Sequence, residues 1–474
     1  MISDFKDLTI RKALKGLSSK EFSSRELAEN AISIVKEKDE DIHAFLEVFD
    51  DLLLEADSAD KAIARGEKGG LLGVPLAIKD NILIKGKKAS AGSKILEGYT
   101  ATYDSTVISK LKKSGAIFVG RTNMDEFGMG SSTENSAYGP TRNPLDLSRV
   151  PGGSSGGSAA SVLMGAVSSA IGTDTGGSVR QPASLCGLVG LKPTYGAVSR
   201  FGIIALGTSL DQVGPITKNV EDAEILFSII KGNDPMDSTS LSDSFYSSKK
   251  TLPEKPTIGI PRDFLGDGID PEVRRIYEEA VVKWKSLGCS VKDISLPNAH
   301  YALSIYYIVL PAEISSNLAR YDGVRYGLHQ GGESLISDYL KTRGLGFGPE
   351  PRRRIILGTY VLSHGYYDAY YAKAMALRRL ITSDFENAFK EVDIIMTPTT
   401  PTPAFKIGEK TSNPLTMYLE DIFTTPVSLS GVPAISIPAG FAKAEIPLPV
   451  GVQLIAPHTR EDLLFQAGKL FEML

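Results

Sequence analysis

Glycine and serine are concentrated between Gly152 and Ser178, in the two runs PGGSSGGSAA and GTDTGGS. Glycines at this density let several backbone N–H groups approach one point, because no Cβ stands in the way and positive φ is accessible. A Gly/Ser turn that enters a helix also leaves N–H groups unpaired, and these suit an anion or a developing oxyanion. The block therefore predicts either a phosphate site or a serine that acts as a nucleophile.

Two of the chemistries that such a block can support match the sequence poorly. Phosphate binding calls for GxxxxGK[ST], or for a strand followed by GxGxxG and a helix, and neither pattern occurs. The segments Gly152–Gly156 and Gly153–Gly157 fit GxSxG, but a nucleophile elbow needs a hydrophobic strand before it and TRNPLDLSRVP is a loop. A Ser–His–Asp triad also needs a histidine base, and no glycine-rich or site-like context surrounds the candidates His300, His329, His364 and His458.

Serine catalysis without histidine requires another base that is neutral near pH 7. A lysine can serve if burial lowers its pKa, because desolvation disfavours the ammonium form. Lys79 ends the apolar run GVPLAI and is followed by Asp80 and Asn81. Most lysines are solvated surface charges, whereas the end of a buried strand is a less typical setting. Lys79 is therefore the candidate base, although the pattern alone leaves an ordinary surface lysine open.

The elements that must position these groups alternate between short apolar runs, glycine-rich turns and helix-length segments. This mixture predicts an α/β fold whose sheet is covered on both faces, and Pro271–Leu287 is a typical helix of it. The small-residue segment Ser158–Ile171 also reads as a buried helix. Six apolar runs predict buried strands: Val74–Ile78, Ala116–Val119, Ile258–Ile260, Val392–Met396, Ala434–Ile437 and Val450–Ile455.

The first 68 residues have a helical pattern, with a possible capping box at Ser23–Glu26 ahead of apolar residues at helical spacing. We expect residues 1–68 to pack on a catalytic domain that comprises residues 69–474. Three polar stretches predict long loops: Gly232–Pro256, Thr342–Arg352 and Thr397–Leu415.

Composition excludes several classes of protein. A net charge of −4 provides no general attraction to nucleic acid or anionic lipid. Cys186 and Cys289 are too few for a disulfide framework, and no Cys/His cluster has zinc-ligand spacing, so no metal is expected. The N-terminus MISDFKDLTI lacks a secretory pattern, and Ala159–Ile171 is too short and polar to span a membrane. We expect a cytoplasmic protein.

The run GGSSGGSAA…GTDTGGSVRQPASLCGLVGLKPTYG, from Gly152 to Gly196, resembles the amidase-signature family, and the resemblance extends from Gly73 to Ile455. It implies a single large α/β/α fold with a central mixed sheet. By the same resemblance, Ser178 matches the nucleophile, Ser154 the bridging serine after a cis peptide bond, and Lys79 the base. The backbone N–H groups of Thr175, Gly176, Gly177 and Ser178 match the oxyanion hole.

Within this family, the chain most resembles the subunits that hydrolyse glutamine for tRNA-dependent amidation. The resemblance implies that a partner, the B subunit, uses ATP and Mg²⁺ to amidate Glu-tRNA(Gln), Asp-tRNA(Asn) or both, and that a small C subunit assists. This chain would need no cofactor and would meet tRNA mainly through its partner. Asp125 and Glu126 could line the ammonia route. A stand-alone amidase for other carboxamides is the alternative. The resemblance is carried by Thr122–Gly157, Leu191–Thr217, Ser315–Gly327, Leu357–Tyr371 and Leu419–Pro438.

A pocket for free glutamine needs a fixed cation for its α-carboxylate and a fixed anion for its α-ammonium. Arginine suits the carboxylate because its fork binds two oxygens at once. The resemblance places these functions on Arg354 and Asp421, with Arg353 as the alternative arginine. A substrate-binding tyrosine falls at Tyr307 or Tyr306, of which Tyr307 is favoured. Without the resemblance, these charges would read as surface residues.

Overall fold

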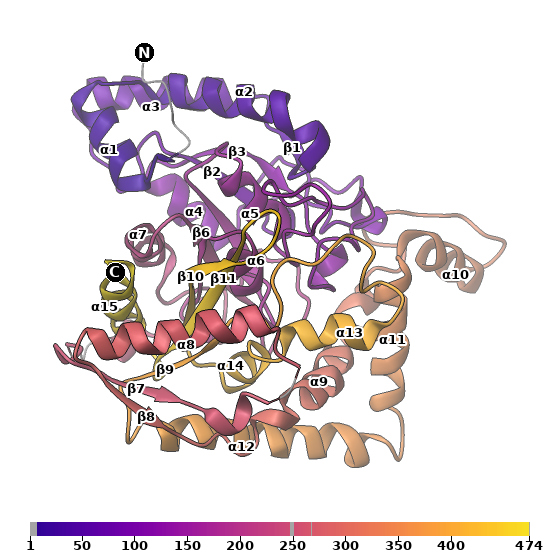
Figure 1. The fold of residues 1–474 in the computed structure, drawn as a ribbon. Coiled ribbons are helices and arrows are strands. Elements are labelled where there is room, and N and C mark those ends of the chain that lie inside the picture. Colours follow the sequence, from indigo (N-terminus) through magenta and orange to yellow (C-terminus); the bar gives the residue numbers. More distant parts are fainter. Residues whose placement is uncertain (1–6, 247–250, 267, 474) are drawn as a thin grey trace.

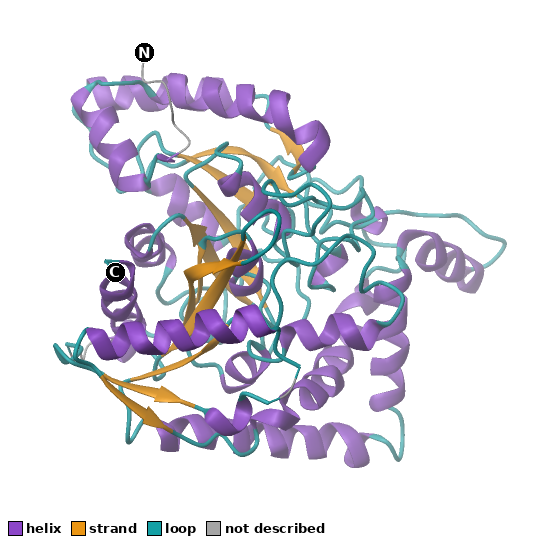
Figure 2. Cartoon of the chain, in the orientation of Figure 1, coloured by secondary structure: helices purple, strands orange, loops and turns teal. Residues whose placement is uncertain are grey.

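A computed structural model describes residues 7–246, 251–266 and 268–473. Its strands form one mixed sheet in the order β1-β3-β2-β4-β6-β5-β10-β11-β9-β7-β8, with helices around it (Figures 1 and 2). The predicted α/β class and central mixed sheet are confirmed. The strands are β1 Phe45–Val48, β2 Pro75–Lys79, β3 Ile117–Thr122, β4 Ser169–Asp174, β5 Val189–Lys192, β6 Gln212–Thr217, β7 Thr257–Ile260, β8 Ser290–Asp293, β9 Ile394–Pro398, β10 Ala434–Ala442 and β11 Leu448–Ile455.

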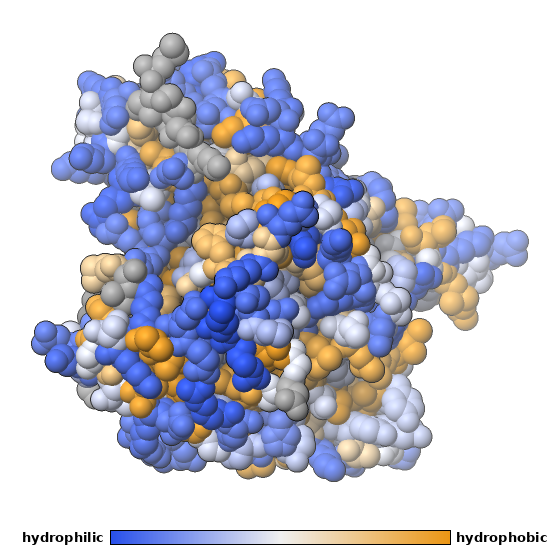
Figure 3. Space-filling model, viewed as in Figure 1, coloured by the Kyte–Doolittle hydropathy of each residue, from blue (hydrophilic) through white to orange (hydrophobic). Residues whose placement is uncertain are grey.

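The helices lie on both faces of the sheet and at its ends. In Figure 1 the first three helices form the indigo end of the molecule, α8 crosses in front of the strands, and α10 projects from the body. The surface viewed in Figure 3 is mainly hydrophilic over α2, and hydrophobic residues gather at the margin where α10 and α11 lie. The helices are α1 Ile10–Ser19, α2 Ser24–Ile42, α3 Leu52–Ala64, α4 Thr106–Lys113, α5 Gly156–Leu163, α6 Arg180–Leu185, α7 Val220–Ile230, α8 Pro271–Ser286, α9 Ala302–Asn317, α10 Leu335–Gly346, α11 Pro349–Val361, α12 Lys373–Ala388, α13 Pro414–Tyr418, α14 Thr425–Ser430 and α15 Glu461–Glu472.

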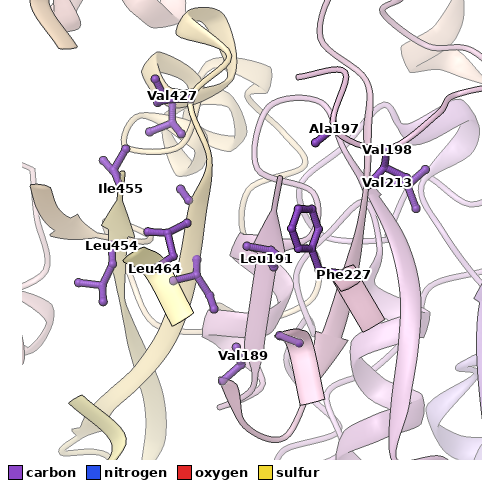
Figure 4. Close-up of a cluster of buried hydrophobic side chains, with 14 of the residues drawn as sticks. Val189, Leu191, Ala197, Val198, Val213, Phe227, Val427, Leu454, Ile455 and Leu464 are labelled. Atoms are coloured by element: carbon purple, nitrogen blue, oxygen red, sulfur yellow. The ribbon is translucent and has the colours of Figure 1, made fainter. Parts of the chain in front are cut away.

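Both faces of the sheet are buried at β2 and β4, where side chains alternate between two hydrophobic clusters. On β2, Leu76 and Ile78 belong to one cluster and Ala77 to the other. On β4, Ala170 and Ile171 divide in the same way, as the two-residue period of a strand requires. Figure 4 shows part of the first cluster, in which side chains of β5, β6 and β11 meet residues of α7 and α15. A group at the end of β2 or β4 is therefore far from bulk water.

The six predicted strands are confirmed as β2, β3, β7, β9, β10 and β11, with shifted ends. The predicted helix Pro271–Leu287 is α8, and the capping box is present, since Ser23 accepts from the N–H of Glu26 and that side chain accepts from the N–H of Ser23. Residues 1–68 are not purely helical, because β1 pairs with β3 at the sheet edge. The division at residue 68 stays a prediction.

Two predictions of local structure are wrong. The helix expected over Ser158–Ile171 ends at Leu163, and β4 begins at Ser169. Gly165, with φ of 87°, ends the helical turn, and the strand that follows is buried on both faces and so lacks a regular apolar–polar alternation. The loop expected over Thr342–Arg352 holds the end of α10 and the start of α11.

The remaining expectations concern loops, termini and metals. In its described residues, the Gly232–Pro256 stretch carries one short helical turn, at Asp243–Tyr246. The Thr397–Leu415 stretch begins with the last two residues of β9 and is irregular from Thr399 until α13 begins. Residues 1–6, where no secretory pattern was expected, and residues 247–250 lie outside the described part. Within that part, no helix is long and apolar enough to cross a membrane, and no cluster of His, Cys, Asp and Glu is arranged for a metal.

Candidate active site

Lys79 is the last residue of β2, which lies between β3 and β4 in the sheet, and its side chain is fully buried. Its Nζ lies 2.8 Å from Ser154 Oγ and 2.8 Å from Ser155 Oγ. Thr173, on β4, provides its Oγ1 at 3.0 Å and its carbonyl oxygen at 3.3 Å. In the part of the chain that the structure describes, every hydrogen-bond partner of this amine is a hydroxyl or a carbonyl oxygen, and none is a carboxylate.

The surroundings of Lys79 favour the neutral amine. Burial lowers the pKa of Lys79 to about 7, and the charges of Asp125, Asp174 and Asp211 act in the opposite direction. The desolvation of the ammonium outweighs these three carboxylates because none of them forms an ion pair with it. A substantial fraction of the amine is therefore unprotonated at neutral pH, which a general base requires.

Ser154 lies in the turn that leads into α5, and the peptide bond between Gly153 and Ser154 is cis. The turn is closely packed against Asp125, since a Cβ on Gly153 would lie 2.2 Å from Asp125 Oδ2. Asp125 itself accepts the N–H of Thr133 at 2.8 Å. A glycine at position 153 and a carboxylate at position 125 therefore pack together in the turn that carries Ser154.

Ser178 lies in the turn between β4 and α6, and its carbonyl oxygen accepts the N–H of Ser155 at 3.1 Å. The turn is closed by Asp174, which takes Nε and Nη2 of Arg180 at 3.0 and 2.9 Å; both side chains are fully buried. Among the described residues, no acceptor takes the N–H groups of Gly176, Gly177 or Ser178. The turn therefore presents free donors beside the serines.

The glycines of this turn are backed by bulky side chains. A Cβ on Gly176 would lie 2.4 Å from the Tyr306 hydroxyl oxygen, and one on Gly177 would lie 2.4 Å from Thr424 Oγ1. Gly177 also has φ of 146°, which L side chains rarely adopt. Thr175, the first predicted oxyanion residue, is held by its hydroxyl, which donates to Asp211 at 2.7 Å.

Arg354, on α11, is buried among aromatic rings. Its Nε donates to Glu350 Oε1 at 2.7 Å, and its guanidinium lies 5.1 Å from the ring centroid of Tyr307 and 5.3 Å from that of Tyr418. The two tyrosine rings stack at 3.8 Å. Only 5% of the Arg354 side chain is exposed, against 49% of Arg353. Burial therefore separates the two arginines that the sequence left open, and Arg354 is the one beside Tyr307.

Asp421 supplies a buried carboxyl group near this arginine. Burial raises the pKa of Asp421 to about 7, while the Ser131 hydroxyl, which donates to it at 2.6 Å, and the charge of Arg354 act to lower it. A cavity of about 240 Å³ next to these residues is lined by Ser131, Glu350 and Arg354. A fixed cation thus lines this cavity, and the titratable carboxyl group of Asp421 lies behind Ser131 in its wall.

The sequence matches the family model "Amidase" over residues 26–465. The chain belongs to the amidase family. It is 51% identical to the A subunit of glutamyl-tRNA(Gln) amidotransferase from Cyanothece sp., over 98% of this chain and 97% of that one. It is also 51% identical to the A subunit from Carboxydothermus hydrogenoformans, over 98% and 96% of the two chains. The crystal structure of the A subunit from Thermotoga maritima superposes with a TM-score of 0.80 at 43% identity, covering 98% of this chain and 94% of that one.

Two residues of this amidase site were not predicted from the sequence. Ser155 Oγ lies 2.8 Å from the amine of Lys79, the same distance as Ser154 Oγ, and Thr173 Oγ1 lies 3.0 Å from it. Ser155 follows Ser154 directly, and the doubled serine in a glycine-rich turn was the available signal. Nothing in the pattern distinguished Thr173, because its position depends on β4 pairing with β2.

Asp125 and Glu126, expected near an ammonia route in this amidase, both hold backbone in place. Asp125 accepts the N–H groups of Thr133 and Asn135, at 2.8 and 3.0 Å. Glu126 accepts the Ser93 hydroxyl at 2.5 Å and the N–H of Gly348 at 3.0 Å, just before α11. Their part in ammonia transfer stays a prediction.

Proposed function

We propose that this chain is the glutaminase subunit of a tRNA-dependent amidotransferase, which hydrolyses glutamine to glutamate and ammonia. The observation that carries the proposal is a fully buried Lys79 hydrogen-bonded to Ser154, in a chain that also has a pocket lined by the buried Arg354, with the buried carboxyl group of Asp421 bound to Ser131 of its wall. Similarity over nearly the whole length to the A subunits of glutamyl-tRNA(Gln) amidotransferases supports the same function.

In the proposed reaction, neutral Lys79 takes the hydroxyl proton of Ser154 as Ser154 takes that of Ser178. Ser178 Oγ attacks the side-chain amide carbon of glutamine, and the oxyanion accepts N–H groups of the Thr175–Ser178 turn. The relay returns a proton to the amide nitrogen, the C–N bond breaks, and ammonia leaves a glutamyl ester on Ser178. Water, deprotonated through the same relay, cleaves the ester and gives glutamate.

Arg354 and Asp421 would recognise the amino-acid end of the substrate. The Nε of Arg354 is occupied by Glu350, but its terminal nitrogens have no hydrogen bond to any described residue and can receive the α-carboxylate. Ionised Asp421 would pair with the α-ammonium. Tyr307 would order the arginine by stacking, since its ring faces the guanidinium.

The ammonia would be used by a partner, the B subunit, which binds ATP and Mg²⁺ and amidates Glu-tRNA(Gln), Asp-tRNA(Asn) or both, with a small C subunit completing the complex. This chain needs no cofactor for the steps above, and tRNA would be bound mainly by the partner. Amidation of aminoacyl-tRNA would place the complex in the cytoplasm.

The test is ammonia release from glutamine and from simple aliphatic and aryl amides, by the chain alone and with the B and C subunits. We expect glutamine to be the preferred substrate, glutamine-dependent amidation of misacylated tRNA by the complex, and loss of both in Ser178→Ala. Hydrolysis of simple amides with no activity on glutamine, even in the presence of both partners, would instead identify a stand-alone amidase.

A further inference from the structure

Exposed hydrophobic side chains are unusually concentrated in one segment of the chain. Of the twenty-six large hydrophobic side chains that are exposed in the described residues, twelve lie between Val324 and Tyr370, which is about a tenth of the chain. Nine of them lie on α10, on α11 and on the π-helical turn η8, Tyr367–Ala372, while Val324 and Tyr326 precede α10 and Tyr366 directly precedes η8. We call this the α10–α11 surface. Single exposed hydrophobic residues need no explanation, whereas a contiguous patch marks an interaction site.

The outer face of α10 is the most exposed part of this surface. Ile336 and Leu340, four residues apart on one helical face, are each 70% exposed, and Leu345 is 67% exposed. The inner face is fixed, because Arg343 donates to the carbonyl groups of Leu318 and Tyr321 at 2.9 and 3.0 Å. Helix α10 therefore projects from the body as an anchored platform (Figure 1), and Figure 3 shows hydrophobic residues on this margin.

Helix α11 connects this surface to the substrate pocket. Its inner face carries Arg354, and its outer face carries Ile356, which is 70% exposed, and Tyr360, which is 45% exposed. Between them, Gly358 packs so closely on α9 that a Cβ would lie 1.8 Å from the carbonyl oxygen of Pro311. The same α9 carries Tyr306 and Tyr307. One helix thus separates the α10–α11 surface from the pocket.

We infer that the α10–α11 surface is the docking site of a partner protein subunit that presents a hydrophobic face with room for tyrosine rings. The inference rests on the proposed function, which requires a partner to receive the ammonia. Twelve large side chains, exposed by between 38% and 70%, offer on the order of 1,000 Å². A stable interface takes roughly 800 Å² from each partner, and the largest patch on a monomer is typically about 300–600 Å².

The composition of this surface also favours a protein over tRNA or a second copy of the chain. The rings of Tyr360, Tyr366 and Tyr370 cluster on it beside the exposed Tyr367, and tyrosine is enriched in protein interfaces. Residues 324–370 hold six basic and four acidic side chains, which is too small an excess for a phosphate backbone. A second copy on the same surface would occupy the position that the ammonia acceptor needs.

The test compares glutamate substitutions inside and outside the surface. Ile336→Glu/Leu340→Glu on α10 and Ile356→Glu on α11 place charges where the partner would bind, whereas Leu54→Glu on α3 and Val282→Glu on α8 change side chains that are 69% and 63% exposed elsewhere. Each purified variant is titrated with the purified B and C subunits, and its hydrolysis of a small neutral amide is measured without them. Light scattering gives the mass of each chain alone.

We expect the two α10–α11 variants to bind the partner subunits at least about 100-fold more weakly than wild type, because an unpaired charge is buried in the interface. The two control variants should bind within about threefold of wild type, and all four should hydrolyse the small amide at the wild-type rate. If wild type binds the partners and the α10–α11 variants bind equally well, the inference is wrong and the proposed function stands. If wild type does not bind the partners, both fail. A wild-type dimer that the substitutions convert to a monomer would assign the surface to a second copy.

Discussion

Replacing Lys79 by methionine should abolish amide hydrolysis and, near neutral pH, remove a destabilising group from the fold. Burial lowers the pKa of Lys79 from its ordinary value of 10.5 to about 7. As the pH falls below 10.5, the unfolded chain binds a proton that the folded chain does not bind until about pH 7. The wild-type free energy of unfolding is therefore reduced below pH 10.5, increasingly so down to about pH 7, and it recovers as the pH rises.

The size of this effect follows from the two pKa values. The reduction in the free energy of unfolding is about 4 kcal/mol at about pH 7.5 and about 1 kcal/mol at about pH 10. Methionine carries no proton, so the stability of Lys79→Met relative to wild type should fall by about 3 kcal/mol between these pH values. The hydrogen bonds lost from Ser154, Ser155 and Thr173 shift both values equally and leave the difference unchanged.

Urea unfolding of both proteins at the two pH values measures this difference directly. Lys192 provides the matched control, because it is also fully buried with its pKa lowered to about 7, and the one described group to which its Nζ donates is the carbonyl oxygen of Pro193. Lys192→Met should show the same dependence on pH and keep amide hydrolysis within about tenfold of wild type. A stability difference between Lys79→Met and wild type that is constant with pH to within about 1 kcal/mol would show an ordinary lysine and refute its role as base.

Three further predictions concern the pocket and the packing of α11. Burial raises the pKa of Asp421 to about 7, so the KM for glutamine should rise as the pH falls below this value. The KM for a small neutral amide should stay constant. If steady-state kinetics show the two KM values changing in parallel, this prediction is wrong. Arg354→Met should raise the KM for glutamine by about 10- to 100-fold and leave the KM for the small amide unchanged. Replacement of the half-exposed Arg353 by methionine should keep the KM for glutamine within about threefold of wild type. If Arg354→Met raises the KM of both substrates equally, Arg354 is structural. Gly358→Ala should lower the free energy of unfolding by about 3 kcal/mol, because its Cβ would meet a carbonyl oxygen of α9 at 1.8 Å. Gly344, also in a helix, has open space around it, so Gly344→Ala should raise the free energy of unfolding by about 1 kcal/mol. Urea unfolding measures both changes. Equal stability of the two would refute the close packing.

Hydrophobic runs in the sequence predicted the strands that are bounded by clear turn residues. They did not predict strands where such turn residues are missing or where the strand itself contains glycine or proline. Strand β4 follows α5 after only five residues of similar small and apolar character, so the two read as one helix. Strands β5 and β6 are short and contain Gly190, Gly214 and Pro215, which strand propensity disfavours. Their pairing with neighbours in the centre of the sheet overrides that preference. Such long-range pairing cannot be seen in a local window.

The candidate site shows a similar division between local and long-range information. Position and residue type singled out Lys79, and the family resemblance added Ser154, Ser178, Arg354 and Asp421. The contacts of Lys79 with Ser154 and with Thr173 span 75 and 94 residues. The contact with Thr173 exists because β2 lies next to β4 in the sheet, and the contact with Ser154 exists because α5 packs on these two strands. Likewise, only the orientation of α11 distinguishes a buried arginine from its exposed neighbour.

The same carboxylates that hold the loops of this site also set the basicity of Lys79. Asp174 is neutralised by Arg180, and Asp211 is held by the N–H groups of Leu206 and Gly207 and by the Thr175 hydroxyl. Because each carboxylate is bound by its own donors, none approaches the amine closely enough to form an ion pair and keep it charged. Yet their combined potential opposes the effect of burial, without which the pKa of Lys79 would fall further and the amine would be a weaker base. The loops that place the serines therefore also keep the pKa of the amine near neutral pH, where a base is most effective.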